Sequence, residues 1–453
     1  RVTTGNISIR RGIFQGDTLS PLLFCLALNP ISFELNRLPL GYRVSCRDAE
    51  LSINHSWYMD DIKLYGKTTK DVTTLVSTVC GVGDDIGMNL NPAKCAVLHV
   101  RRGKPDEGCS IQVGDETIAE SLRLNETYKY LGVVQAAMIP HPQLKTQLTA
   151  EYKKRLYLLL NSGLNARNMI KAINTYALPV MTYSYGIVNW TEAEIKTTDR
   201  ATRSALTASG FHHPKASVNR LYMKRGDGGR GLVSCEDMHG RSMCGLARYM
   251  STSPIDRISL LYQYHQQKPT TKSHSITAKA AKFLSSLDLP AAGPALPNKH
   301  TIKQACAERK SKTLSTMPLH GRYWSRLEEN RLDKELTFMW LKSRTLKPST
   351  EGMIMAAQDQ SLKTKNYQYA IMKSIPRTDA NCRLCKGSLE TIDHIVSACP
   401  VLARTSYIER HNRIVKYVHF EMCKARDLPT GASRFDHQLK ALVKSNQYRL
   451  YRE

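Results

Sequence analysis

Features that would mark a membrane-bound or secreted protein are missing from this sequence of 453 residues. It contains no run of about 18 apolar residues, the length that a membrane-crossing helix needs. It shows neither a secretory signal pattern nor a lipidation motif. Most of its 12 cysteines are scattered singly, as is typical of free thiols in a reducing compartment. These absences predict a soluble, intracellular protein with no membrane partner.

Acidic residues are scarce relative to basic ones. The chain has 39 Asp and Glu against 65 Lys and Arg, a formal net charge of +26. A charge this large, spread along the chain, indicates a polyanionic partner such as nucleic acid. The length is sufficient for about two or three domains with a sizeable core.

Two of the few acids are adjacent, in the tetrapeptide Tyr58-Met59-Asp60-Asp61. Apolar residues on both sides predict two short strands joined by a tight turn; they are Ile53, Trp57, Ile62 and Leu64, with Gly66 closing the segment. Both carboxylates on such a turn can face one divalent cation, and hard oxygen ligands suit Mg²⁺ held together with substrate phosphates. An isolated Asp-Asp pair can equally be a polar turn, so the neighbouring segments decide.

Residues 10–21 precede the pair and predict a Gly-containing loop that opens a buried helix, with Ser20 as N-cap and Pro21 at the first helical position. A helix start with arginines nearby suits a phosphate or a nucleic-acid backbone. Residues 87–95 and 128–133 follow the pair. In this order the four segments resemble the palm of a reverse transcriptase of the non-LTR (LINE-like) retrotransposon type.

The resemblance implies a catalytic role for three residues. Asp60 and Asp61 would bind Mg²⁺, and Lys94 would assist proton transfer to the leaving pyrophosphate. A lysine beside a turn is also commonly a solvated charge, so both interpretations of Lys94 stay open.

The resemblance also implies contacts with the RNA template, the DNA primer or target and the deoxynucleoside triphosphates. Gln15 and Gly16 would lie against the nucleotide and template, Tyr58 and Met59 near the primer end, and Tyr130, Leu131 and Gly132 would form the primer grip.

One part of the family pattern is missing. Reverse transcriptases of this type carry a further catalytic aspartate upstream of the Gln15 segment, whereas residues 1–9 contain no acid. We therefore expect the C-terminal portion of a longer polyprotein, beginning inside the palm and inactive by itself.

From residue 142 to about 260 the apolar spacing is helical. One stripe comprises Leu144, Leu148, Tyr152, Leu156 and Leu159. Lys153, Lys154 and Arg155 beside it either follow a nucleic-acid backbone or solvate the outer face. This block resembles the thumb of the same family. Residues 214–232 resemble its post-thumb signature, in which glycines either allow close approach to phosphates or form an ordinary turn.

Residues 266–312 hold nine Lys or Arg against two acids, with four prolines, which predicts a basic linker that is partly ordered at best. Residues 324–360 look helical in the middle and resemble the family's linker before a zinc knuckle. The sequence assigns no chemistry to them.

A second constellation follows the spacing C-x2-C-x8-H-x4-C at Cys382, Cys385, His394 and Cys399. It offers four ligands for a tetrahedral, structural Zn²⁺, and the alternative is a chance cluster of thiols. The spacing resembles the knuckle of non-LTR elements that insert at fixed genomic sites. Because no other cysteine has a workable spacing, we expect one zinc per chain.

Arg410-His411-Asn412 resembles the entry into the restriction-like endonuclease of those elements, but no acidic Pro-Asp motif follows before Glu453. His411 is therefore expected to be structural or to contact nucleic acid. The expected fold class is α+β: a partial reverse transcriptase palm (1–140), an α-helical thumb and post-thumb region (141–265), a basic linker and helical segment (266–375), and a zinc knuckle with the start of a truncated endonuclease region (376–453).

The sequence thus predicts an RNA-directed DNA polymerase that uses two-metal nucleotidyl transfer, here without the upstream aspartate and fingers. The alternative is a catalytically inactive nucleic-acid-binding protein that keeps thumb, linker and knuckle. A group II intron maturase or telomerase-like polymerase is disfavoured by the C-terminal knuckle. The family resemblance implies a nuclear protein with a cytoplasmic phase.

Overall fold

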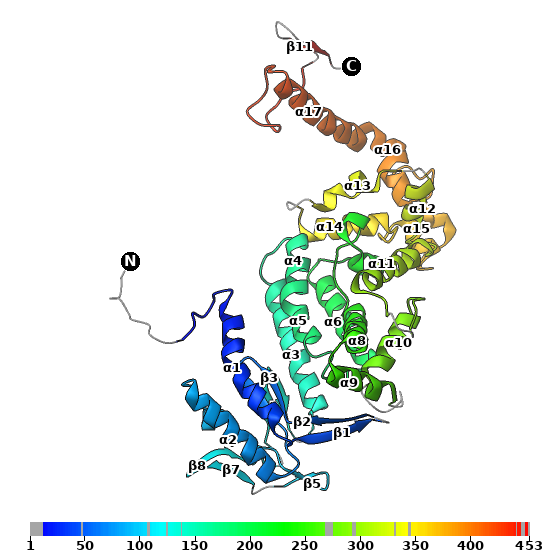
Figure 1. Cartoon of the computed structure of the whole chain (residues 1–453). Helices are drawn as coiled ribbons and strands as arrows, with labels where there is room; N and C mark the ends of the chain where they lie inside the picture. The colour runs from blue at the N-terminus through cyan, green and yellow to red at the C-terminus, as the bar shows by residue number, and fades with distance from the viewer. Residues whose placement is uncertain are drawn as a thin grey trace. The chain divides into compact units, whose positions relative to one another are not determined.

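A computed structural model describes residues 12–46, 49–106, 109–123, 126–136, 138–267, 275–291, 296–329, 332–342, 346–440, 442–444 and 449–451 (Figure 1). The chain forms two compact units. Unit 1 comprises residues 1–161, 172–202 and 233–306, and unit 2 comprises residues 162–171, 203–232 and 307–453.

The first part of unit 1 combines two helices with antiparallel hairpins. The helices are α1 (Ser20–Arg37) and α2 (Thr69–Asp85). The paired strands are β1 (Tyr42–Cys46) with β2 (Ala49–Ile53), β3 (His55–Tyr58) with β4 (Asp61–Leu64), β5 (Val100–Arg101) with β6 (Lys104–Pro105), β7 (Ser110–Val113) with β8 (Glu116–Glu120), and β9 (Tyr128–Tyr130) with β10 (Val133–Gln135).

Helix α2 has two buried faces. Leu75 and Val79 pack with Leu35 of α1 and with the β3–β4 hairpin, while Val76 packs with Ile111 of the β7–β8 hairpin. The helix begins at a capping box, in which the Thr68 hydroxyl accepts from the Asp71 N–H and the Asp71 carboxylate accepts from the Thr68 N–H. Helix α2 therefore ties the β3–β4 hairpin into the core of the unit.

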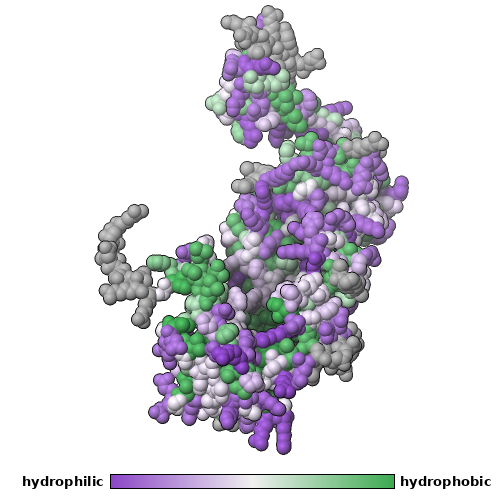
Figure 2. Space-filling view, in the orientation of Figure 1, coloured by the Kyte–Doolittle hydropathy of each residue, from purple (hydrophilic) through white to green (hydrophobic). Residues whose placement is uncertain are grey.

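The expectation for the start of α1 is wrong in two details. Ser20 is not the N-cap: it lies inside the helix, and its hydroxyl donates to the Phe14 carbonyl at 2.7 Å. The helix is not buried throughout, because only its second half packs on α2, through Leu28, Ile31 and Leu35. The first half exposes apolar side chains, at Leu19, Leu22, Leu23 and Leu26. Apolar surface gathers there in Figure 2.

The rest of unit 1 is helical. Its elements are α3 (His141–Leu160), the π-helix η2 (Ile173–Ala177), α5 (Leu178–Thr182), α8 (Cys235–Thr252), α9 (Asp256–Gln267), α10 (Ile276–Ser285) and the first parts of α6 (Glu192–Ala208) and α11 (Lys299–Ser315). The predicted stripe of α3 is confirmed, since Leu144, Tyr152 and Leu156 are buried and Leu148 and Leu159 are partly buried.

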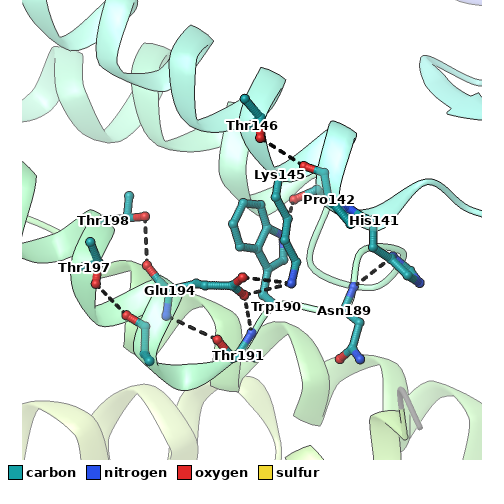
Figure 3. Close-up of polar contacts among 12 residues, drawn as sticks. His141, Pro142, Lys145, Thr146, Asn189, Trp190, Thr191, Glu194, Thr197 and Thr198 are labelled. Atoms are coloured by element: carbon teal, nitrogen blue, oxygen red, sulfur yellow. Dashed lines mark hydrogen bonds and ion pairs between the residues drawn. The ribbon is translucent and has the colours of Figure 1, made fainter. Parts of the chain in front are cut away.

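Helices α3 and α6 are joined by polar contacts around Trp190, shown in Figure 3. Lys145 of α3 donates to both carboxylate oxygens of Glu194 at 2.9 and 3.0 Å and lies 5.8 Å from the centre of the Trp190 ring. From α10, Lys279 donates to the Trp190 carbonyl at 2.9 Å, and burial lowers the pKa of this lysine to about 8.

The expected basic linker is wrong over much of its length. It contains α10 and the start of α11 (Lys299–Ser315). Helix α10 buries Ile276, Ala280 and Leu284, with Ser275 as its N-cap. The composition of the stretch was misleading because the amphipathic helix α10 lies between Pro269 and Pro290, and α11 begins after Pro297.

Unit 2 carries the remaining helices, which are mostly short. They are α4 (Ala166–Ala172), α7 (Val218–Tyr222), η3 (Arg225–Asp227), α12 (Arg322–Glu329), α13 (Lys334–Thr337), η4 (Met339–Lys342), α14 (Pro348–Gln358), α15 (Lys365–Ala370), η5 (Arg377–Ala380), η6 (His394–Ala398), α16 (Pro400–Leu402), η7 (Ala403–Tyr407) and α17 (Ile408–Ala425). One short hairpin, β11 (Leu442–Lys444) with β12 (Arg449–Tyr451), follows them.

The glycine-rich segment after α7 is packed against protein. A Cβ on Gly228 would lie 2.5 Å from the Trp324 ring, and one on Gly229 would lie 2.2 Å from the Met223 carbonyl oxygen. The close approach that these glycines allow is therefore to the hydrophobic core of unit 2, which includes Trp324 and Phe338. Of the two interpretations of this segment, the structure favours a turn.

Buried ion pairs hold the same segment. Arg220 donates to Asp359 at 3.1 Å and, through Nε and Nη2, to the Gly228 carbonyl at 3.0 and 2.8 Å. Arg225 and Arg230 pair with Glu351 at 2.6 and 3.3 Å. Arg220, Arg230, Glu351 and Asp359 are almost completely buried. These pairs connect the glycine turn to the helical region 346–360, and the loss of one partner would leave a buried charge uncompensated.

No helix in the described ranges has the length and apolar character required to span a bilayer.

Candidate functional sites

The Asp60–Asp61 pair lies at a hairpin turn, as predicted. Tyr58 pairs with Asp61 and Trp57 with Ile62 across β3 and β4, so Met59 and Asp60 form the turn. Met59 has a left-handed φ of 55°, and the Trp57 ring N–H donates to its carbonyl. Tyr58, Met59, Asp60 and Asp61 are all exposed. Both carboxylates are consequently open to a ligand from solvent.

A buried polar network supports the hairpin from α1. The amide of Asn54 donates to the Leu35 carbonyl at 2.5 Å, and the two ring nitrogens of His55 contact Asn54 and Ser32, each at 2.8 Å. Burial, and secondarily the positive charge of Arg257, lowers the pKa of His55. A neutral imidazole suits this network, in which one ring nitrogen donates and the other accepts.

The residues predicted to form the primer grip make a second hairpin, called the primer-grip hairpin after that prediction. Leu131 and Gly132 make its turn with left-handed φ values of 47° and 76°, and the Tyr183 hydroxyl donates to the Leu131 carbonyl at 2.5 Å. Lys63 of β4 donates to Gln135 of β10 at 2.8 Å and lies 5.3 Å from the centre of the Tyr130 ring. The structure therefore brings the Asp pair and the primer-grip hairpin together.

Lys94 ends the short helix η1 (Pro92–Lys94) and is exposed. The Tyr128 hydroxyl donates to its carbonyl at 3.0 Å. Burial raises the pKa of Tyr128, and the charges of Cys95 and Asp61 raise it further, so this phenol lies within the electrostatic reach of the Asp turn. These contacts place the backbone of Lys94 beside the primer-grip strand.

Gln15 and Gly16 lie in an exposed turn before α1, with Gly16 at a φ of 103°. The Asp17 carboxylate accepts from the Leu19 N–H at 3.2 Å. Among the described residues, no third acid joins Asp60 and Asp61 in a group of metal-ligand size.

The four predicted zinc ligands converge in unit 2. Their ligand atoms all lie within 4.8 Å of one another, and Cys382, His394 and Cys399 are buried. Two thiolates on one tetrahedral Zn²⁺ stand about 3.8 Å apart, and a thiolate and an imidazole nitrogen about 3.5 Å. The Sγ atoms of Cys382 and Cys399 are 4.0 Å apart, and Cys385 Sγ lies 3.3 Å from His394 Nε2. The residues thus fit a zinc ion.

A turn and a helical segment present these ligands. Cys382 and Cys385 lie on a turn closed by the Lys386 N–H, which donates to the Cys382 carbonyl at 2.8 Å, with Lys386 left-handed at a φ of 56°. His394 begins the π-helical turn η6, and Cys399 directly follows its end. Although burial opposes it, hydrogen bonds from the Cys385 and Leu384 backbone lower the pKa of Cys382 to about 7. A lowered thiol pKa favours metal binding.

Two supporting residues of this cluster were missed from the sequence. Glu390 is buried and accepts from the Arg383 guanidinium at 2.7 and 2.8 Å and from the Lys365 N–H at 2.9 Å, and the Arg383 contact lowers its pKa to about 2. The Tyr407 hydroxyl accepts from the Cys399 N–H at 3.1 Å and donates to the Ile395 carbonyl at 2.9 Å. In the sequence, Glu390 could have been noticed as an acidic residue between Cys385 and His394.

Beyond the knuckle, His411 is exposed on α17, so it has no packing role. Its neighbour Arg410 donates to the Val396 carbonyl at 2.9 Å and stacks on Tyr407. Arg410 therefore connects α17 to the knuckle.

Comparison with known proteins agrees with this arrangement. Residues 2–135 match the family "Reverse transcriptase (RNA-dependent DNA polymerase)". The chain is 25% identical over 423 residues to a Pol polyprotein from the type-1 retrotransposable element R2 of Popillia japonica, covering 92% of this chain and 63% of that protein. It is 24% identical over 199 residues to the polyprotein of the type-2 element R2DM of Drosophila melanogaster, covering 43% of this chain and 18% of that one.

The chain thus spans less than two thirds of the length of these relatives. The family match covers both the Asp60–Asp61 hairpin and the primer-grip hairpin, while the longer alignment extends over most of both units. The chain is similar to the Pol polyproteins of R2-type retrotransposable elements, and its residues 2–135 match the reverse transcriptase family.

Proposed function

We propose that this chain provides the catalytic turn of an RNA-directed DNA polymerase, with Asp60 and Asp61 as Mg²⁺ ligands. The main support is the β3–β4 turn, which carries two consecutive, exposed aspartates within the segment that matches the reverse transcriptase family. In this proposal residues 12–135 form part of the palm, and the helices of residues 141–265 form the thumb.

When bound, Mg²⁺ stabilises charge on the phosphate oxygens. The chain's own task is positioning. The turn would hold the metal ligands against the triphosphate, and the hairpin of Tyr130, Leu131 and Gly132, fixed to β4 through Lys63, would orient the primer end for attack on the α-phosphate.

Further exposed residues would contact the nucleotide, the template and the primer. Gln15 and Gly16 would lie against the nucleotide and template, and Tyr58 and Met59 would contact the primer end. Lys94 would protonate the leaving pyrophosphate. The template would be RNA, the primer or target DNA, and the protein would act in the nucleus after synthesis in the cytoplasm.

Two carboxylates are fewer than a two-metal site requires, and the described residues supply no third. This observation supports the second candidate, a nucleic-acid-binding protein without polymerase activity of its own.

Primer extension on an RNA template separates the candidates. The assay compares the 453-residue chain with the same chain joined to the upstream palm and fingers of an R2 polyprotein. We expect negligible extension by the first and Mg²⁺-dependent extension by the second. Asp60→Asn or Asp61→Asn in the second protein should abolish extension and leave RNA binding intact.

Asp85→Asn is the matched control, because Asp85 is an exposed acid at the end of α2. Extension that survives both turn substitutions would refute the assignment of the site. Robust extension by the 453-residue chain alone would instead refute the proposal that its set of metal ligands is incomplete. No extension by either protein would favour the nucleic-acid-binding protein without polymerase activity.

A further inference from the structure

A second group of metal-ligand side chains lies beyond the zinc knuckle. His419 and Cys423 are one turn apart on α17, and His437 comes from the loop that follows the helix. Their ligand atoms lie within 4.8 Å of one another. All three residues are buried, with exposed fractions of 5%, 0% and 2%. The spacing of these three residues in the sequence matches no standard zinc motif, which is why the sequence predicts a single zinc site.

The fold brings His437 to the helix through a tight return of the chain. The Leu428 N–H donates to the Cys423 carbonyl at 2.9 Å, which turns the chain at the end of α17. A Cβ on Gly431 would lie 2.7 Å from the His437 nitrogen, so only glycine fits beside the histidine backbone. Lys416 donates to the Phe435 carbonyl at 2.6 Å and holds the loop on α17.

We propose that His419, Cys423 and His437 bind a second zinc ion, which fastens this loop to α17. Two imidazoles and one thiolate are ligands of the type that Zn²⁺ prefers. Three protein ligands leave a fourth position for water. On binding, the Cys423 thiol releases its proton to solvent.

Packing supports a role for metal at this point. The hydrophobic cluster here consists of Cys423, Leu428 and Val443. A segment with so small a core depends on a crosslink or a metal for independent stability. Cys423 belongs both to this cluster and to the ligand group, so a metal bound there would join helix and loop.

The distances are close to those that a metal requires. Cys423 Sγ lies 3.5 Å from His419 Nδ1, as expected for two ligands of one tetrahedral zinc. His419 Nδ1 and His437 Nε2 are 2.7 Å apart, whereas two nitrogens on one zinc stand about 3.3 Å apart. The rings need to separate by about half an ångström.

The competing arrangement is a metal-free hydrogen bond between the rings. The Gly431 N–H points at His437 Nδ1 at 3.3 Å, so a neutral His437 would carry its proton on Nε2 and donate it to His419. Zinc bound to Nε2 would require the His437 proton to move to Nδ1, which would end the contact of the Gly431 N–H with that nitrogen. Metal content distinguishes the two arrangements.

The test is zinc stoichiometry of the purified 453-residue chain, measured by elemental mass spectrometry. We expect two zinc ions in the wild type and one in Cys423→Ser or His437→Gln. Cys385→Ser, which opens the knuckle, should also retain one, and the double variant Cys385→Ser/Cys423→Ser none. Cys244→Ser is the matched control because Cys244 is a buried thiol of α8, in unit 1, and it should retain two.

A second measurement covers variants that fold poorly. His437→Cys replaces one zinc ligand with another and should restore the zinc that His437→Gln loses, which a packing role would not do. Cobalt substitution in the Cys385→Ser background should give the thiolate charge-transfer band of a one-cysteine site, absent after Cys423→Ser. One zinc in the wild type, undiminished by Cys423→Ser, would overturn the proposal.

Discussion

The Asp60–Asp61 turn and the Cys382–Cys399 cluster are the two metal sites predicted from the sequence, and they differ in how far their side chains are buried. The aspartates are exposed at a turn, without a third acid among the described residues. In the cluster, Cys382 and Cys399 are 2% and 0% exposed, and Glu390 and Tyr407 fix the surrounding backbone.

This difference in burial indicates a different role for each predicted metal. A closed set of four protein ligands leaves no position for a substrate and therefore stabilises the fold. An open pair leaves room for phosphate oxygens and water, which Mg²⁺ requires. We therefore expect buried polar groups to stabilise the fold of this chain and exposed polar groups to remain accessible to a ligand.

Removal of zinc should have the largest effect. Structural zinc contributes about 10–16 kcal/mol in small zinc-finger peptides, more than a segment the size of the knuckle can gain from its own core. A strong chelator should therefore abolish hydrogen-exchange protection in residues 376–407. Protection of residues 55–64 should not change, since that hairpin needs no zinc. A knuckle that stays protected without metal would show that its fold is independent of zinc.

Neutralisation of a buried acid should cost far more than neutralisation of an exposed one. Asp359→Asn leaves the buried Arg220 without its charged partner, and we expect a loss of about 3–5 kcal/mol of stability in unit 2. Asp60→Asn should change stability by less than about 0.5 kcal/mol.

Hydrogen exchange of residues 218–228 under rising urea measures the effect of Asp359→Asn locally, which avoids assuming that both units unfold together. The urea concentration at which half of the protection is lost should therefore differ between Asp359→Asn and Asp60→Asn. Equal values would contradict the distinction between buried and exposed acids.

Features with a local pattern were predictable from the sequence. The pairing of Trp57 with Ile62 follows from alternation across a tight turn, the burial of Leu144, Tyr152 and Leu156 follows from helical spacing, and the knuckle ligands lie within 18 residues. Each pattern is complete within one or two elements.

Features that depend on distant segments were not predictable. Arg220 and Asp359 are 139 residues apart in sequence, so neither residue indicates the other. The exposed face at the start of α1 and the loop that carries His437 to α17 also depend on tertiary structure. These elements form because of packing rather than because of a local sequence signal.

The burial of one lysine should make the stability of the chain depend on pH. Burial lowers the pKa of Lys279 to about 8 from an ordinary value of 10.5, so the folded chain loses this proton before the unfolded chain does. Below pH 8 the cost of burying the charge is fully present, and between pH 8 and 10.5 the stability of the wild type should rise relative to Lys279→Met. For a partly exposed group we expect about 1 kcal/mol at pH 9.5.

Lys282→Met is the control, since Lys282 lies on the same helix but is exposed. Thermal unfolding of both variants at pH 7 and pH 9.5 provides the measurement. A relative stability of Lys279→Met that does not depend on pH would contradict the lowered pKa.

The smallest expected effect is on RNA binding, from substitution of exposed lysines. On α3, Lys153 and Lys154 are exposed, whereas Arg155 is engaged by Glu151 at 2.7 Å and stacks on Tyr176. If the exposed lysines contact phosphates, each substitution to Gln should reduce the slope of log K against log salt by about one unit in a titration with single-stranded RNA. Arg155→Gln should leave the slope unchanged and instead destabilise the packing of α3. Slopes that respond to Arg155 and not to the lysines would reverse the assignment of ligand-facing and structural charges on this helix.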